Sequence, residues 1–302
     1  MPNRLFIWRG ELTSRRSLTN RGLSFLSSGM LWLAIFLIVP TIVFMALSFA
    51  DRGEYGEIIW KFTVDNYQRL MGYSVFGWTP DYLYILWRSV VVAGITTGIS
   101  VLLAYPLSFF IASRPPRSRY LWLTLVIVPF WTNMVIRAYA WFLILAPELP
   151  FAKVAAFLGL VPSGSALYPS PIAVYLGMVS MFLPFVTLPL YSSVERLDWS
   201  LVEAAQDLYS SRTRVFFKAI LPQTMPGLSV GVVLTFVPAM GTFIVPDLLG
   251  GAKYMLVGNL IQQQFGASRD WPFGAAVSMA LMVLTMISLQ LYRRRGEEIE
   301  LL

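Results

Sequence analysis

The chain has 302 residues, of which 57% are hydrophobic and 13% are charged, and its formal net charge is +7. A soluble domain carries about 25% charged residues, so we expect an integral membrane protein. The sequence contains no Cys and no His, which excludes disulfides, thiolate nucleophiles, histidine acid–base chemistry and the usual zinc and haem ligands. We expect no cofactor and no metal site. The phosphate-binding pattern Gly-x-x-x-x-Gly-Lys-Ser/Thr is also missing, so we expect no ATP site in this chain.

The N-terminal segment, residues 1–24, is strongly basic, with five arginines against the single acid Glu11. A charge-free apolar run follows that is long enough to cross a bilayer, whereas a signal peptide would have a shorter apolar core. We therefore predict a first transmembrane span at about 26–49, with a kink at Pro40.

Residues 51–84 form a polar loop in which acids alternate with Trp and Tyr, as is typical of a segment at the lipid–water interface. A second charge-free run predicts a span at about 89–112, and the basic turn 113–120 then reverses the chain. The third apolar run is interrupted by Pro129, and we place the third span at about 120–145.

No charge occurs between 154 and 194. We predict a short interfacial helix at 151–160. The fourth span, at about 171–191, should start with Ser170 as N-cap and Pro171 at the first helical position, a frequent start signal.

After a polar insert, we expect the fifth span at about 227–246 and then a loop at 247–270. The sequence Asp270-Trp271-Pro272 is another N-cap followed by proline, and it predicts the start of the sixth span. That span, at about 271–292, should stop at the three arginines 293–295.

Six spans place both termini on the same side of the membrane. Lys and Arg are concentrated in the N-terminal segment, the turn, the insert 193–226 and the three arginines 293–295 that precede the tail 296–302. The positive-inside rule then makes both termini and the insert cytoplasmic. Orientation accounts for the basic charge, so we expect membrane lipid, and no nucleic acid, around an all-α transmembrane domain at 25–295.

Ionisable groups within the predicted spans are scarce. The spans contain no pair of carboxylates, which proton-coupled carriers and intramembrane proteases usually keep at membrane depth. Arg137 is the one clear charge bordered by apolar sequence on both sides. It either snorkels from a helix end or serves as a gate or ion-pair partner.

The insert 193–226 is a polar, helix-prone segment between two apolar runs. Glu203 and Asp207 lie four residues apart, on one face of a helix. Ser210 and Ser211 can end that helix, and a second helix would stop at Pro222. Such a helix–turn–helix beneath the membrane either packs on its own bundle or docks a partner. Its expected apolar side chains are Leu201, Val202, Ala205 and Leu208, then Val215, Phe216 and Ile220.

Glu203-Ala204-Ala205, with Leu221-Pro222 at the matching distance, resembles the "EAA" loop of permease subunits of bacterial type I ABC importers. In that family a Gly stands four positions after the second Ala, and an Ile stands two positions before the Leu-Pro pair. This sequence has Tyr209 and Ala219 there. Because Gly would supply a turn with positive φ, we expect the turn to shift to the following serines or the first helix to lengthen.

Other stretches resemble the polyamine (spermidine/putrescine) branch of these permeases. The resemblance covers about residues 25–295, and permeases for other small solutes share parts of it. The matching stretches are 128–133 with Ile136-Arg137, 190–193 with Glu195, 238–241, 247–253, and 258–259 continuing to 269–276.

The resemblance implies the type I permease fold and a non-catalytic subunit in the bacterial inner membrane. It also implies a second homologous permease subunit, two cytoplasmic ATPase subunits docked on the paired inserts, and a soluble solute-binding protein on the outer face. The implied ATPase-coupling residues are Glu203, Ala204, Ala205, Asp207, Leu208, Tyr209, Arg212, Leu221 and Pro222.

A flexible polycation needs carboxylates and aromatic faces, and the acidic, aromatic outer loops are compatible with one. Opines, phosphonates, amino-acid-like solutes and metal chelates remain alternative solutes, and a stand-alone carrier is the alternative protein class. Each candidate aromatic can equally be a helix-packing residue. The candidate pathway residues are Asp247, Trp131, Asn133, Arg137, Tyr139, Trp141 and Met240.

Overall fold

The computed structural model describes residues 26–27, 29–74, 77–162, 164–208, 211–251 and 254–300, with side chains as far as Tyr292. Within these ranges, five helices are long and apolar enough to cross a membrane, or six if one bent pair counts as a single span. This confirms the all-α membrane fold class. The expectations for the N-terminal segment, the tail end 301–302, the side chains of 293–295, Tyr209 and Ser210 lie outside the described residues.

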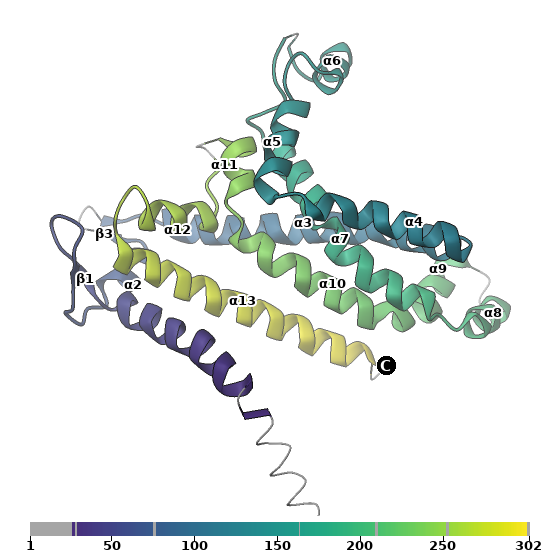
Figure 1. Ribbon diagram of the computed structural model, residues 1–302, viewed down its shortest axis with the longest axis horizontal. Helices are drawn as coiled ribbons and strands as arrows, with labels where there is room; N and C mark the ends of the chain where they lie inside the picture. The colour runs from purple at the N-terminus through teal and green to yellow at the C-terminus, as the bar shows by residue number, and fades with distance from the viewer. Residues whose placement is uncertain are drawn as a thin grey trace, which may run out of the picture.

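Four long helices run side by side along the molecule (Figure 1). α3 (Asp81–Ala112), α7 (Pro171–Glu195) and α10 (Leu221–Gly241) pack against one another, and α13 (Trp271–Glu300) lies beside α10. A further helix, Gly29–Ser48, is mostly exposed. Charge-free runs fold as helices because lipid offers no hydrogen-bond partners, and a helix satisfies its own backbone groups.

The close approach of α7 and α10 depends on glycine. A Cβ added to Gly227 would lie 2.3 Å from the carbonyl oxygen of Pro189, and one added to Gly231 would lie 2.9 Å from the Cα of Val186. Gly227 and Gly231 are one helical turn apart, so they form a smooth strip along α10. Small residues at such positions let two membrane helices pack backbone to backbone.

The third apolar run does not form one straight helix. α4 (Pro116–Ile127) continues as the 3₁₀ turn η1 (Val128–Trp131), and α5 (Met134–Ile144) then departs at 97°. The span expected at 120–145, with an interruption at Pro129, corresponds to this bent pair. The break lies at Thr132 and Asn133, where the Asn133 side chain accepts a hydrogen bond from the backbone N–H of Val135 and so starts α5.

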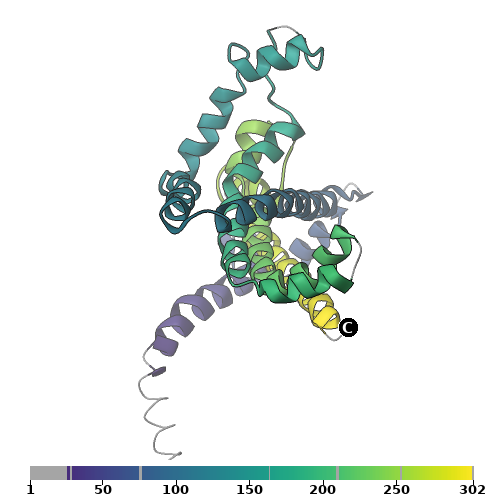
Figure 2. The ribbon, with the colours of Figure 1, turned by 90° about the vertical axis from the view of Figure 1, so that its right-hand side faces the viewer.

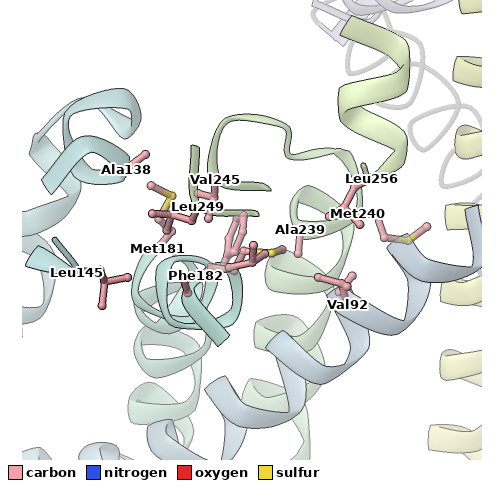
Figure 3. Close-up of a cluster of buried hydrophobic side chains, with 14 residues drawn as sticks. Val92, Ala138, Leu145, Met181, Phe182, Ala239, Met240, Val245, Leu249 and Leu256 are labelled. Carbon is pink, nitrogen blue, oxygen red and sulfur yellow. The ribbon is translucent and has the colours of Figure 1, made fainter. Parts of the chain in front are cut away.

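The main hydrophobic core lies where α3, α5, α7, α10 and α11 (Ile244–Gly250) meet (Figure 3). Met181 and Phe182 of α7, Met240 of α10 and Leu249 of α11 are buried there. Burial of α11 explains why α10 ends at Gly241 instead of near 246, and why the expected loop 247–270 is largely helical. α12 (Val257–Phe265) follows in the same segment.

α5 and the next short helix, α6 (Pro150–Phe157), project away from the long helices in both views (Figures 1 and 2). α6 confirms the predicted short helix at 151–160. The predicted start of α7 is also confirmed, because the Ser170 side chain accepts a hydrogen bond from the backbone N–H of Ala173.

Two other helices extend beyond the expected bounds. α3 begins at Asp81 rather than at Ser89, because its first turns gain a buried face: Ile85 and Leu86 pack against the cluster around Phe273. α13 continues past the three arginines to Glu300, since a positive charge does not by itself break a helix.

Short elements gather at the end of the bundle opposite to the insert (Figure 1). There the Asn66 side chain donates to the backbone carbonyls of Ser48 and Ala50, and Arg69 forms an ion pair with Asp270. These bonds join the loop before α3 to the first helix and to the start of α13. The elements are β1 (Asp51–Arg52) paired with β2 (Ile58–Ile59), α2 (Asp65–Leu70), and β3 (Tyr73–Ser74) paired with β4 (Gly77–Trp78).

Asp270→Asn is expected to lower the thermal stability of the chain. Asp270 is 2% exposed, and its Oδ2 lies 2.7 Å from Nη1 of Arg69. Burial works to lower the pKa of Arg69, but hydrogen bonds to Asp270 and Tyr82 outweigh it and raise the pKa. Asn keeps a side-chain oxygen that can accept the backbone N–H of Phe273, so the substitution removes only the negative charge. We expect the free energy of unfolding to fall by roughly 1–3 kcal/mol, toward the lower end of this range because Arg69 is partly exposed.

The measurement is the unfolding midpoint of purified protein in detergent. Glu54→Gln is the matched control, because Glu54 is exposed and lies in the turn between β1 and β2. Equal midpoints for the two variants would show that the Arg69–Asp270 pair does not stabilise this end of the bundle.

Candidate functional site

The first helix of the insert is α8 (Trp199–Leu208). Asp198 fixes its start: the carboxylate accepts hydrogen bonds from the backbone N–H and the hydroxyl of Ser200. These bonds lower the pKa of Asp198. The backbone N–H of Asp198 donates to the side chain of Gln223 on α10, so the beginning of α8 is tied to the transmembrane helix that follows the insert.

α8 has one buried side and one exposed side. Val202 and Ala205 are buried against Val215. Leu201 and Leu208, which were expected on the same apolar stripe, are instead 55% and 79% exposed. The prediction fails there because positions 201 and 208 are turned by about a third of a helical turn from 202 at the 3.6-residue period, so only the Val202 side of the stripe packs against the second half of the insert.

The exposed side of α8 is therefore an apolar strip beside two acids. Leu201, Ala204 and Leu208 follow one another at helical spacing, and Glu203 and Asp207 lie along their edge, all exposed. No ion pair joins Glu203 to Arg212 in the described part of the insert. This surface is open for contact with another molecule.

The second half of the insert is continuous with α10. After Ser211 caps α9 (Arg212–Val215), the chain passes through the π-helical turn η2 (Phe216–Ile220) and enters α10 without a break. The prediction that Pro222 stops this helix is wrong. The backbone N–H of Leu221 bonds five residues back, to Phe216, and this wider turn accommodates a proline that has no N–H to donate.

The rigid continuation of α9 into α10 links the insert directly to the transmembrane helices. Phe216 packs edge-on against the ring of Tyr105 on α3, whose hydroxyl lies 3.0 Å from that of Thr224. Arg119 at the start of α4 pairs with Glu195 at the end of α7. A displacement of the insert would therefore be passed to α3, α7 and α10. Leu221 is half-buried and Pro222 is exposed along this continuous helix.

A second feature is a pocket of about 440 Å³ on the inner side of the bend between α4 and α5. Its walls are mainly aromatic and Met side chains, and Arg137 is its one charged wall residue. Sequence reasoning missed the rest, because these residues come from separate elements without common spacing. The lining residues are Phe130, Met134, Arg137, Met181, Phe182, Phe185, Pro238, Gly241, Thr242, Phe243 and Ile244.

Of the expected pathway residues, only Arg137 lines this pocket. Trp131 is 82% and Tyr139 50% exposed. Trp141 packs against the main core and donates a hydrogen bond to Ser180, and Met240 is fully buried. The remaining two are Asp247, exposed in the first turn of α11, and Asn133, the exposed N-cap of α5.

The family comparison matches residues 104–294 to the binding-protein-dependent transport system inner membrane component. This stretch contains the insert, the pocket, all of α7 and α10 and most of α13. The chain belongs to this family. The family's members are inner membrane components of binding-protein-dependent transport systems, so the chain is an ABC importer permease, as the resemblance of the insert predicted.

Two relatives of the family match most of the chain. The spermidine/putrescine transport system permease protein PotB of Haemophilus influenzae is 40% identical over 266 residues, covering 88% of this chain and 91% of the relative. PotB of Escherichia coli strain K12 is 41% identical over 263 residues, covering 87% and 93%. Both relatives are named as permease proteins and not as enzymes.

The fold is shared with a solved structure, a bacterial alginate ABC transporter in complex with an alginate pentasaccharide-bound periplasmic protein. The TM-score is 0.70 with 14% sequence identity, and the match covers 96% of this chain and 97% of the other. At this identity the likeness concerns the fold and not the solute.

Proposed function

We propose that this chain is the permease subunit of an ATP-driven importer of polyamines such as spermidine and putrescine. The observation that carries the proposal is the 40–41% identity to the two PotB proteins, sustained over 87–88% of the chain. The chain contributes half of the translocation pathway and performs no catalysis itself. It lies in the bacterial cytoplasmic membrane with both termini and the insert 193–226 on the cytoplasmic side, as the distribution of Lys and Arg indicates.

The partners are a second homologous permease subunit, two cytoplasmic ATPase subunits and a soluble binding protein that delivers the solute on the outer face. The ATPases dock on the exposed side of α8, where Leu201, Ala204 and Leu208 fit an apolar groove and Glu203 and Asp207 pair with basic residues of its rim. Because α9, η2 and α10 form one continuous helix, closure of the ATPases on the insert moves the transmembrane helices as rigid bodies.

The residues proposed for docking differ in their contribution. Glu203, Ala204, Asp207 and Leu208 are exposed and available for direct contact. Ala205 is buried, and its role is to let α8 pack closely on the second half of the insert. Arg212, Leu221 and Pro222 lie on the helix that transmits the movement, and Tyr209 completes the proposed docking set.

Among the proposed pathway residues, exposed side chains are the better candidates for solute contact. Trp131, Tyr139 and Asp247 combine aromatic faces with a carboxylate, which suit a polycation through cation–π and ionic contacts. Asn133 can add a hydrogen-bonding amide. Trp141 and Met240 act through packing, because both belong to the main core.

Uptake of radiolabelled spermidine by vesicles that contain the complete transporter tests this proposal. We expect ATP-dependent uptake that unlabelled putrescine inhibits and that an opine, a phosphonate or alginate oligosaccharides do not inhibit. Selectivity for a neutral or anionic solute would refute the polyamine assignment. Transport by this chain alone, without ATP, would refute the importer mechanism and support a stand-alone carrier.

A further inference from the structure

The guanidinium group of Arg137 is placed in the pocket beside the bend without a polar partner. Its Nε and Nη1 atoms are buried and form no hydrogen bond, and its Cζ lies 4.9 Å from the ring centroid of Phe130. The hydroxyl oxygen of Thr242, on another wall of the same pocket, is also buried and unbonded. The pocket therefore gathers three buried polar atoms from two elements, within walls that are otherwise apolar.

Such an arrangement is costly in the isolated chain. A charge taken out of water costs free energy unless it is paired, and one cation–π contact returns only part of that cost. Phe130 therefore cannot offset the desolvation of Arg137 by itself. In the described part of the chain, no carboxylate lies within ion-pair distance of Arg137. The described part of the chain therefore leaves Nε and Nη1 available to a partner from another molecule.

We propose that the Arg137 pocket receives a carboxylate side chain of the second permease subunit. The proposal rests on the pairing of two permeases, and not on the identity of the solute. A guanidinium presents two N–H groups in a fork that matches the two oxygens of a carboxylate, and the hydroxyl of Thr242 can donate to the same group. The pair would fix the bend between α4 and α5 against the partner.

Two observations favour a protein carboxylate over other occupants. Arg137 is the only charge between Arg119 and Glu148, so it lies deep in apolar sequence, away from the turns where lipid headgroups gather. The other walls of the pocket are apolar except for Thr242, so a carboxylate and the guanidinium would attract each other more strongly there than in water. A polyamine would be repelled by the guanidinium unless a carboxylate had already neutralised it.

Removal of the Arg137 charge distinguishes a role in pairing with the second permease from a role in the stability of this chain alone. Arg137→Met removes a charge that lacks a partner in the isolated chain, so we expect the unfolding midpoint of that chain to stay or rise. The same substitution should weaken co-purification of the second permease by about 30-fold or more, as for truncating one member of a buried charge pair. If Arg137 were purely structural, Arg137→Met would lower both the unfolding midpoint and co-purification. Arg117→Met is the matched control, since Arg117 is exposed in the first turn of α4, and it should change neither.

A charge swap in the complete transporter identifies the partner carboxylate. Arg137→Glu should abolish co-purification and uptake, and one Asp or Glu of the second permease, changed to Arg in that background, should restore both. The proposal is overturned if Arg137→Met leaves co-purification unchanged, if no such exchange restores it, or if the loss appears only in vesicles that contain anionic lipid. Co-purification does not depend on the solute, so failure of spermidine uptake by the unaltered transporter would refute only the polyamine assignment.

Discussion

Gly227→Ala is expected to separate α7 from α10 and to remove most of the folded protein from the membrane fraction. The added Cβ would lie 2.3 Å from the carbonyl oxygen of Pro189 and 2.4 Å from the hydroxyl of Ser193. The carbonyl is backbone, so relief requires the two helices to move apart. Overpacking of a well-packed core costs about 1–3 kcal/mol or more, and here it acts on the contact that holds the bundle centre.

The measurement is the amount and unfolding midpoint of monodisperse protein after extraction in detergent. Gly98→Ala on α3 is the matched control, because a Cβ at Gly98 meets no atom within 4 Å. That substitution should be neutral or stabilising, by up to about 1 kcal/mol, since Ala is the better helix former. Gly231→Ala should fall between the two variants. Similar midpoints for Gly227→Ala and Gly98→Ala would contradict the close approach of α7 and α10.

Ala204→Asp and Ala205→Asp are expected to damage transport by different routes. Ala204 is exposed on the side of α8 proposed to dock the ATPase. A charge there leaves the chain folded, but its desolvation against an apolar groove should reduce ATPase co-purification and spermidine uptake by at least about tenfold, equivalent to 1.4 kcal/mol. Ala205 is 8% exposed and packs against Val215. Asp at 205 should instead destabilise the insert itself.

Limited proteolysis of the insert separates these two routes, since a destabilised α8 is cut faster and a merely undocked α8 is not. Gln206→Asp is the control for charge, because Gln206 is exposed on the other side of α8 and should leave uptake near the parental level. Glu203→Ala should reduce uptake without faster cleavage. Unchanged uptake in both Ala204→Asp and Glu203→Ala would mean that this side of α8 does not dock the ATPase.

The positions and order of the long apolar helices could be predicted from the sequence because lipid imposes one local rule. A charge-free run must satisfy its own backbone hydrogen bonds, so it becomes a helix wherever it stands. Local capping chemistry likewise predicted the starts of α7 at Ser170 and of α13 at Asp270, each confirmed by a side chain that accepts a backbone N–H near the helix start. The Glu-Ala-Ala pattern predicted the importer class, which the family match confirms.

What the sequence could not determine is which apolar side chains face protein. Leu102 on α3 is 74% exposed, and Met178 on α7 is completely buried, yet both lie in charge-free runs. In water an apolar side chain is driven inward, but lipid and protein interior are similar solvents for it, so hydropathy carries little information about packing. The pattern at 201–208 was misassigned for a related reason, since neighbouring apolar residues on α8 divide between its buried and exposed sides.

The candidate site is likewise formed by tertiary contacts that hydropathy does not predict. The 97° bend after Trp131, the burial of α11 against α7 and the resulting pocket arise from segments far apart in the chain. The sequence by itself determined that Arg137 is a solitary charge in an apolar run. Only the tertiary structure decided that its Nε and Nη1 are buried without a partner, in a pocket that Phe130 and Thr242 also line, because the cost of a buried charge depends on neighbours that no local pattern records.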